Sequence, residues 1–185
     1  MKVKGLLVAA VAAMMCMGVQ NASAIEAPNH EGDFFLNVQG GFFSEYSGGI
    51  GANVSGDYVL VNSWWKGHFT VGGFLEFNQS TDKDWLPNVD MKYTNFAIMA
   101  RATYGLNITD KFEVHAGAMT GPVFHSWKYE GDGNIYKDDD DKEAVFGGAG
   151  FAGVRYFFSD NFAVTSELIG GTHLTYFNVG VTFKF

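Results

Sequence analysis

The chain has 185 residues, a formal net charge of −8, and an unusually high content of glycine (24) and phenylalanine (18). This length suits one ordinary domain. The acidic charge argues against a nucleic-acid partner, because binding to phosphates needs a basic surface.

The first segment has the pattern of a secretory signal peptide. Two lysines precede an apolar run from Gly5 to about Val19, and Ala22-Ser23-Ala24 follows it. A basic start, an apolar centre and an A-x-A site are the features of such a signal, and the run is shorter than the ~20 residues of a membrane-spanning helix. We therefore expect a cleavable signal over residues 1–24 and a mature domain over residues 25–185, whose formal charge changes from −8 to −10 as both lysines leave.

Cys16 is the only cysteine and lies inside this expected signal. Met15 precedes it, whereas lipoprotein signals have a small residue at that position. We therefore do not expect lipidation. A mature exported chain without disulfides must gain stability from a large core or from a membrane.

Beyond the signal, apolar residues recur with a period of two rather than with the helical spacing of three and four. In chain order the expected strands cover 33–43, 50–61, 68–78, 92–106, 111–129, 144–158, 162–171 and 172–185. Each strand has one apolar and one largely polar face, because successive side chains point to opposite sides. In the last strand the apolar face consists of Phe177, Val179, Val181, Phe183 and Phe185.

Short connections alternate with connections that are mostly longer. The short ones are "NSWWKG", "NITD" and "SDN", and the long ones include "QSTDKDWLPNVDM" and "EGDGNIYKDDDDKE". This pattern predicts an all-β, antiparallel up-and-down transmembrane β-barrel of about eight strands, with short periplasmic turns and longer external loops. An aromatic girdle is then expected near the periplasmic interface, formed by Tyr104, Phe112, Tyr156, Phe158, Phe162, Phe183 and Phe185.

A secreted sandwich or lipocalin-like barrel is the alternative, with its apolar face turned inward. Such a fold would have to bury a very large number of aromatic side chains in its core.

The signal, the alternating strands and the terminal "VGVTFKF" resemble the small outer-membrane β-barrel family that includes the OmpA transmembrane domain and OmpX, a porin-family-like group. The resemblance implies that the terminal aromatic strand, Phe177 to Phe185, is read by the machinery that inserts such barrels. It also implies residence in the cell outer membrane, in contact with its lipid. Because one barrel architecture serves many activities, the resemblance leaves the function open. No peptidoglycan-binding segment follows Phe185, so anchoring of that kind is not expected.

An eight-stranded barrel has an interior that side chains can fill. The expected inward-facing charged and polar network comprises Glu76, Arg101, Glu113, His115, Arg155 and Glu167. Proximity across the "NITD" turn predicts that Arg101 lies near Glu113 and His115, and proximity across "SDN" predicts that Arg155 lies near Glu167. Our hypothesis is an ion-pair network that plugs the lumen, since an unpaired buried charge is costly. A narrow or gated pore for small solutes or ions is the alternative.

The long connections are expected to expose aromatic and acidic residues at the cell surface, which favours contact with a surface ligand. These residues are Trp85, Trp127, Tyr129, Asp138, Asp139, Asp140 and Asp141. The heptapeptide Tyr136–Lys142 matches the affinity tag DYKDDDDK in all but its first residue, so it is either an inserted tag or a native acidic loop. The acidic run lacks the spacing of a calcium-binding loop, and no metal or other cofactor is expected.

Some small barrels resemble lipid A-modifying enzymes or proteases, so two pairs of residues could be hydrolytic. His125 and Ser126 are adjacent and point to opposite faces of a strand, so they cannot pair. His173 and Thr175 share a face, without a carboxylate nearby in the sequence. A nucleophile needs a base and an orienting third group, so we expect a non-enzymatic protein, with a lipid A-modifying enzyme as a further alternative.

Overall fold

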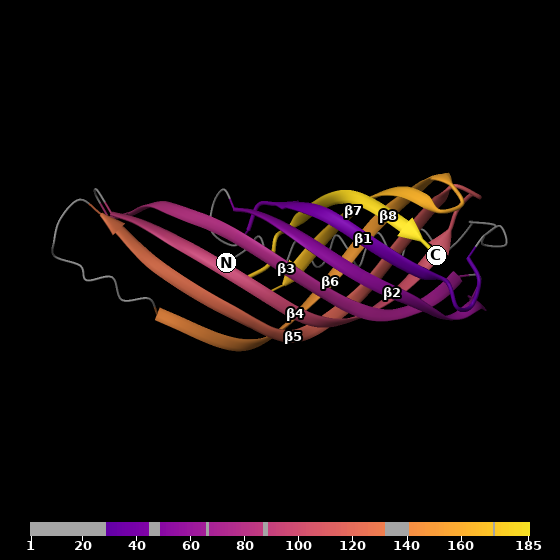
Figure 1. Cartoon of the computed structure of the whole chain (residues 1–185), viewed down its shortest axis with the longest axis horizontal. Helices are drawn as coiled ribbons and strands as arrows, with labels where there is room; N and C mark the ends of the chain where they lie inside the picture. Colours follow the sequence, from indigo (N-terminus) through magenta and orange to yellow (C-terminus); the bar gives the residue numbers. More distant parts are fainter. Residues whose placement is uncertain (1–28, 45–48, 66, 87–88, 132–140, 172) are drawn as a thin grey trace.

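The computed structural model describes residues 29–44, 49–65, 67–86, 89–131, 141–171 and 173–185, which form a closed antiparallel barrel (Figure 1). Neighbours in the chain are neighbours in the barrel, as predicted for an up-and-down topology. The strands are β1 (Phe34–Phe42), β2 (Ile50–Trp64), β3 (Gly67–Leu86), β4 (Val89–Asn107), β5 (Phe112–Gly131), β6 (Asp141–Ser159), β7 (Phe162–Gly171) and β8 (Phe177–Lys184). Among these residues, no helix is long and apolar enough to cross a membrane.

The barrel closes between its first and last strands. β1 pairs with β8 from Phe35 opposite Lys184 to Phe42 opposite Phe177. Beyond this ladder, the backbone N–H of Phe185 donates to the carbonyl of Phe34 at 3.0 Å, and the reverse bond has the same length. Closure leaves no unpaired edge around the central part of the barrel, which is the condition for a sheet to stand in hydrocarbon.

The period-two pattern sets which face of each strand is exposed. Apolar side chains of all eight strands point away from the lumen, and Val54, Leu75, Ile98 and Val164 keep between 39% and 47% of their surface exposed. The intervening polar residues are buried inside. The alternative of a soluble barrel with an inward apolar face is therefore wrong, because the apolar face points outward.

Aromatic side chains gather where the chain makes its short turns, which we call the turn end. Phe158 contacts Tyr156 and Phe162 with ring centroids 5.1 and 6.3 Å apart, and Phe162 contacts Phe183 at 5.6 Å. The row crosses β6, β7 and β8 on the outside of the barrel, in the arrangement of an interfacial aromatic girdle.

The strands differ in length, so one wall of the barrel extends much further than the other. Beyond Ile50 of β2 and Gly171 of β7, β3 to β6 continue to pair only with each other. Figure 1 shows these strands extending well past β1, β7 and β8, on the side away from the C-terminus. We call this extension the projecting sheet, with edges at residues 80–86 of β3 and 141–148 of β6, and the end from which it extends the loop end.

Two connections expected as loops therefore contribute residues to strands. The predicted polar connection 79–91 belongs to β3 up to Leu86 and to β4 from Val89. The predicted charged loop 130–143 gives its first two residues to β5 and its last three to β6. A strand can form here because the backbone pairs with the adjacent strands, as at Thr81 opposite Lys92 and Asp90 opposite Glu130.

Candidate functional site

The barrel interior contains a layer of charged and polar side chains to which all eight strands contribute. Its members are Asn37 of β1, Asp57 of β2, His68 of β3, Arg101 of β4, Glu113 and His115 of β5, Arg155 of β6, Glu167 of β7 and Thr182 of β8, and each is at most 3% exposed. We call this set the ionic layer. Charges buried to this extent are tolerated only where opposite charges and hydrogen bonds compensate them.

Arg101 joins three walls of the barrel. Its guanidinium donates twice to Glu167 across the lumen, from Nη2 to Oε1 at 2.6 Å and from Nη1 to Oε2 at 3.1 Å. Its Nε lies 3.1 Å from Oδ1 of Asp57 on β2. The guanidinium also stands over the ring of Phe151, 4.0 Å from its centroid. A bidentate pair of this kind fixes the direction as well as the distance between its partners.

Arg155 makes the second hub of the layer. Its Nη1 donates to Oε1 of Glu113 at 2.7 Å. Glu113 lies directly opposite Arg155 on the neighbouring strand β5. Nε of Arg155 donates to Thr182 at 3.2 Å and its Nη2 to Asn37 at 3.2 Å, so the same side chain reaches β8 and β1 across the closure of the barrel. Phe35 lies beneath the guanidinium, 4.6 Å away at its ring centroid.

His115 connects the two hubs. Its Nε2 lies 3.0 Å from Oε1 of Glu167, and its Nδ1 lies 3.5 Å from Oε1 of Glu113. His68 adds a contact of 3.7 Å to Oε2 of Glu113. The chain of contacts therefore runs without a break from Asp57 through Arg101, Glu167, His115 and Glu113 to Arg155.

The partners differ from those expected across the hairpin turns. Arg101 pairs with Glu167 and Asp57 rather than with Glu113 and His115, and Arg155 pairs with Glu113 rather than with Glu167. Hairpin proximity fails as a guide for two reasons: Arg101 reaches across the lumen to Glu167, and Arg155 pairs with Glu113 directly opposite it on the neighbouring strand β5.

Glu76, which was expected in the same network, lies in a separate group nearer the loop end. Its carboxylate accepts from Asn78 Nδ2 at 2.7 Å, from the backbone N–H of Thr175 at 2.8 Å and from the Thr175 hydroxyl at 3.0 Å. No ion pair to Glu76 is found among the described residues. The carboxylate is 1% exposed, so these neutral donors replace water around it.

These bonds hold the connection between β7 and β8, residues 173–176, inside the barrel. The sequence pattern predicts strand from residue 172, but β8 begins at Phe177. His173 adopts a left-handed backbone conformation with a φ of 58°, and its carbonyl accepts from Asn78 Nδ2 at 2.9 Å. Leu174 and Thr175 are both fully buried. We call residues 173–176 the stopper.

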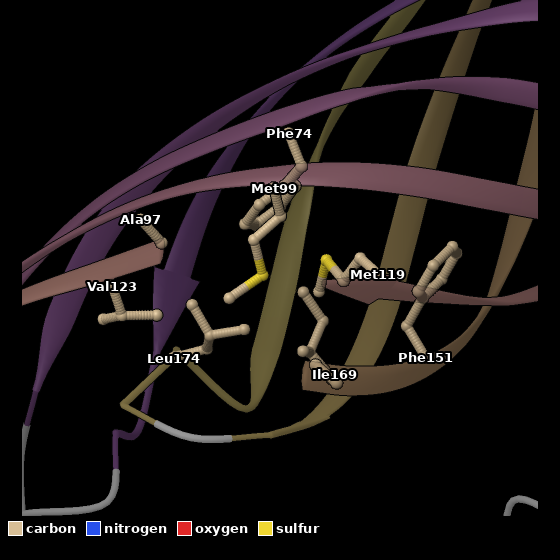
Figure 2. Close-up of a cluster of buried hydrophobic side chains, with 9 residues drawn as sticks. Phe74, Ala97, Met99, Met119, Val123, Phe151, Ile169 and Leu174 are labelled. Atoms are coloured by element: carbon tan, nitrogen blue, oxygen red, sulfur yellow. The ribbon is translucent and has the colours of Figure 1, made fainter. Parts of the chain in front are cut away.

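Leu174 completes an apolar cluster that fills part of the lumen (Figure 2). In Figure 2 the Leu174 side chain extends from the connection between β7 and β8. It lies between Val123 and Ile169, with Met99 and Met119 above it. The other members are Phe74, Ala97, Ala149 and Phe151. Burying such a side chain completely is worth about 1.5–3 kcal/mol, which favours the inward position of the stopper.

Two inward-facing glycines form a seat for Thr175. Gly41 of β1 and Gly51 of β2 stand directly opposite each other in the register. A Cβ on Gly41 would clash with the Thr175 hydroxyl, and a Cβ on Gly51 would stand 3.0 Å from the Thr175 methyl and 2.7 Å from Asn78 Cβ. The absence of both side chains is therefore what allows the stopper to approach this wall.

The two histidines beside hydroxyl residues, His125 and His173, are not arranged as catalytic bases. His125 is hydrogen-bonded to Asn95 and stacks on His173, with centroids 4.6 Å apart. The Thr175 hydroxyl bonds directly to Glu76, a carboxylate from another strand that sequence proximity could not reveal. The order nucleophile, histidine, carboxylate is thus not formed here. In the described part of the chain, no group of three or more His, Cys, Asp or Glu is placed to hold a metal ion.

The residues proposed for the surface and for membrane insertion take these positions. Trp85 belongs to β3, Trp127 and Tyr129 to β5 and Asp141 to β6, all in strands rather than loops. Asp138, Asp139 and Asp140 lie outside the described residues. Phe177, Val179, Phe183 and Phe185 are exposed on the outside of β8, and Val181 of the same face is half-buried.

A closed antiparallel barrel with apolar side chains outward and a charged interior is the architecture of an integral β-barrel membrane protein. The chain belongs to the family of outer membrane protein beta-barrel domains, whose family model matches residues 8–185. It is therefore an integral barrel of the outer membrane, as the sequence resemblance implied.

Solved structures share this fold at low sequence identity. A de novo designed transmembrane β-barrel is 11% identical, with a TM-score of 0.53, and the match covers 85% of this chain and 98% of that one. The attachment invasion locus protein Ail of Yersinia pestis, in complex with the heparin analogue sucrose octasulfate, is 13% identical with a TM-score of 0.51, over 84% of this chain and all of that one. Neisserial surface protein A is 12% identical with a TM-score of 0.50, over 82% and 95%. The comparison with curated proteins gave no match.

Proposed function

We propose that the protein is a non-enzymatic structural barrel with a sealed lumen, and that its projecting sheet offers the surface for external contacts. The ionic layer carries this proposal, because its bonded side chains come from every strand and cross the full width of the lumen. The stopper adds a second barrier nearer the loop end. A non-enzymatic role is supported by the direct bond of Thr175 to Glu76, which leaves no histidine to act as its base.

The orientation follows from the lengths of the connections. In outer-membrane barrels the short turns face the periplasm and the long elements face outward. We infer that the turn end is periplasmic and that the projecting sheet lies outside the cell. Residues 1–24 are proposed to be removed on export. The mass of the protein extracted from outer membranes tests this removal directly. The exposed apolar face of Phe177 to Phe185 is proposed to contact the insertion machinery.

The sealed lumen predicts an electrically silent protein. In a planar bilayer, the refolded protein is expected to give no discrete conductance steps, with circular dichroism confirming its β content. Silence is expected because the bonded guanidinium groups of Arg101 and Arg155 connect facing walls across the lumen.

Reproducible single-channel steps from folded wild-type protein would overturn the sealed-lumen proposal and favour the narrow pore. The matched control is a preparation of the same protein that has been heat-unfolded before addition. It distinguishes barrel conductance from leaks caused by aggregates.

A further inference from the structure

We propose that a monovalent metal cation, Na⁺ or K⁺, binds inside the lumen between the ionic layer and the stopper. The residues that carry the inference are Gln39 of β1, Asn53 of β2 and Glu76 of β3, and each is at most 3% exposed. We call these three residues the oxygen row, because each has a side-chain oxygen that can bind a cation. The inference goes beyond the proposed function.

The strand register places the oxygen row in one line across three adjacent strands. Gln39 stands directly opposite Asn53, and Asn53 stands directly opposite Glu76. Directly opposite side chains share a face, with Cβ atoms about 4.5–5.5 Å apart. The middle side chain is the shortest, so the two longer ones can converge above it. On the same face of β1, Gln39 is flanked by Asn37 of the ionic layer and by Gly41 of the stopper's seat.

Two amide groups of the row have buried polar atoms that lack hydrogen-bond partners. In the described part of the chain, neither Nε2 nor Oε1 of Gln39 finds one. Asn53 donates from Nδ2 to Asn178 Oδ1 at 2.8 Å, whereas its own Oδ1 also lacks a partner. Buried polar atoms are normally paired, so each exception needs an explanation. A cation bound by both amide oxygens provides one for these two atoms.

The charge that such a cation would balance is that of Glu76. The other three buried carboxylates of the lumen each lie within 3.1 Å of a guanidinium nitrogen. His68 and His115 contact carboxylates of the ionic layer. Among the described residues, no positively charged group pairs with Glu76. A buried charge without a partner is costly, and a cation in the oxygen row would compensate it.

The hydrogen bonds of Glu76 leave one of its oxygens available. Asn78 and the backbone N–H of Thr175 both donate to Oε1. The Thr175 hydroxyl lies 3.0 Å from Oε2, but it also lies 2.8 Å from Asn178 Oδ1. A hydroxyl has one proton and serves one of these acceptors at a time. Oε2 therefore retains capacity for a cation.

The donor set favours a hard cation with a single charge. Carboxylate and amide oxygens suit hard cations rather than metals that prefer nitrogen or sulfur. The row contains one carboxylate, so a divalent ion would leave a positive charge uncompensated in a buried site. This composition also distinguishes the row from groups of three or more His, Cys, Asp or Glu, of which the described chain has none.

The test measures how the stability of the full-length protein depends on the cation. The protein is refolded in phospholipid vesicles in NaCl, KCl or N-methylglucamine chloride at equal ionic strength, so that the ion can enter before the stopper closes. The midpoint of urea unfolding is followed by tryptophan fluorescence. We expect one metal salt to raise the midpoint by about 1 M when its concentration is about a hundred times the dissociation constant. The more effective salt identifies the ion.

The sharpest variant is Q39M, which keeps the length of the side chain and removes its oxygen. Because Gln39 makes no hydrogen bond in the described chain, Q39M breaks none. It should lose the response to the metal cation, while its midpoint in N-methylglucamine chloride stays equal to that of the wild type or rises. E76Q should lose the response as well. The matched control is E143Q, which removes an exposed carboxylate and should keep the full response.

Three results would overturn the proposal. The first is a wild-type midpoint that is equal in all three salts, and the second is a metal response that survives in Q39M. The third is an infrared band of a protonated carboxyl group in the wild type that disappears in E76Q, because a neutral Glu76 needs no cation. If E76Q does not fold, Q39M and the salt comparison still decide. Conductance by the wild type would reject the sealed lumen without changing these outcomes.

Discussion

Replacement of Arg101 by glutamine is expected to lower the free energy of unfolding by about 3–5 kcal/mol, the usual cost of removing one partner of a buried ion pair. Glutamine cannot supply the positive charge that Glu167 and Asp57 now share at 2.6 and 3.1 Å. Two carboxylates would remain in the lumen with too few donors. The measurement is urea unfolding of protein refolded in phospholipid vesicles, followed by tryptophan fluorescence.

Two further variants separate the ion pair from a general effect of substitution. K111Q removes a lysine exposed at the turn end and should change the free energy of unfolding by no more than about 0.5 kcal/mol. Adding E167Q to R101Q should recover part of the loss, because it neutralises one of the stranded carboxylates, and the double-mutant cycle reports the coupling. Unchanged stability in R101Q would show that the ionic layer does not hold the barrel together.

The sequence was sufficient for the architecture because a lipid-facing barrel repeats one rule in every strand. Outward Val54 and inward Asp57 belong to one alternating run, and similar runs recur eight times. The same rule identified the inward charges. It could not identify their partners: Arg101 and Glu167 are 66 residues apart and meet only because the barrel closes. Pairing across a lumen depends on strand stagger, which no local pattern encodes.

The projecting sheet was missed for a different reason. Residues 79–91 are polar enough to suggest a loop, yet residues 79–82 pair with β4 and residues 89–91 pair with β5, so hydrophobicity is not needed there. The stopper was missed because its residues continue the alternating pattern of β8. Its signal in the sequence was Gly41 and Gly51, two glycines at inward positions of adjacent strands, which mark a close approach of other chain atoms.

A side chain placed in the glycine seat should expel the stopper. In G41V the new side chain would overlap the Thr175 hydroxyl and the amide oxygen of Asn178. In the wild type the Thr175 hydroxyl donates to this amide oxygen at 2.8 Å. Residues 173–176 would then lose both the bonds to Glu76 and the burial of Leu174. We expect a cysteine introduced as L174C to be unreactive toward a membrane-impermeant maleimide in the otherwise wild-type protein and to react at least tenfold faster beside G41V. The factor corresponds to about 1.4 kcal/mol in favour of the open position.

The stopper should be displaced only when the new side chain is added at Gly41. A valine at a second glycine of the barrel tests this expectation. Gly73 lies on the exposed face of β3, and a Cβ there would meet only the Met99 carbonyl at 3.9 Å. G73V adds the same isopropyl group to a strand glycine, so L174C should stay unreactive beside it. A C16S background removes the natural cysteine from both measurements. If L174C reacts equally fast beside G41V and G73V, the stopper is held by general barrel stability and Gly41 is not its seat. If only G41V accelerates the reaction, the buried position of the stopper depends on the absence of a side chain at Gly41.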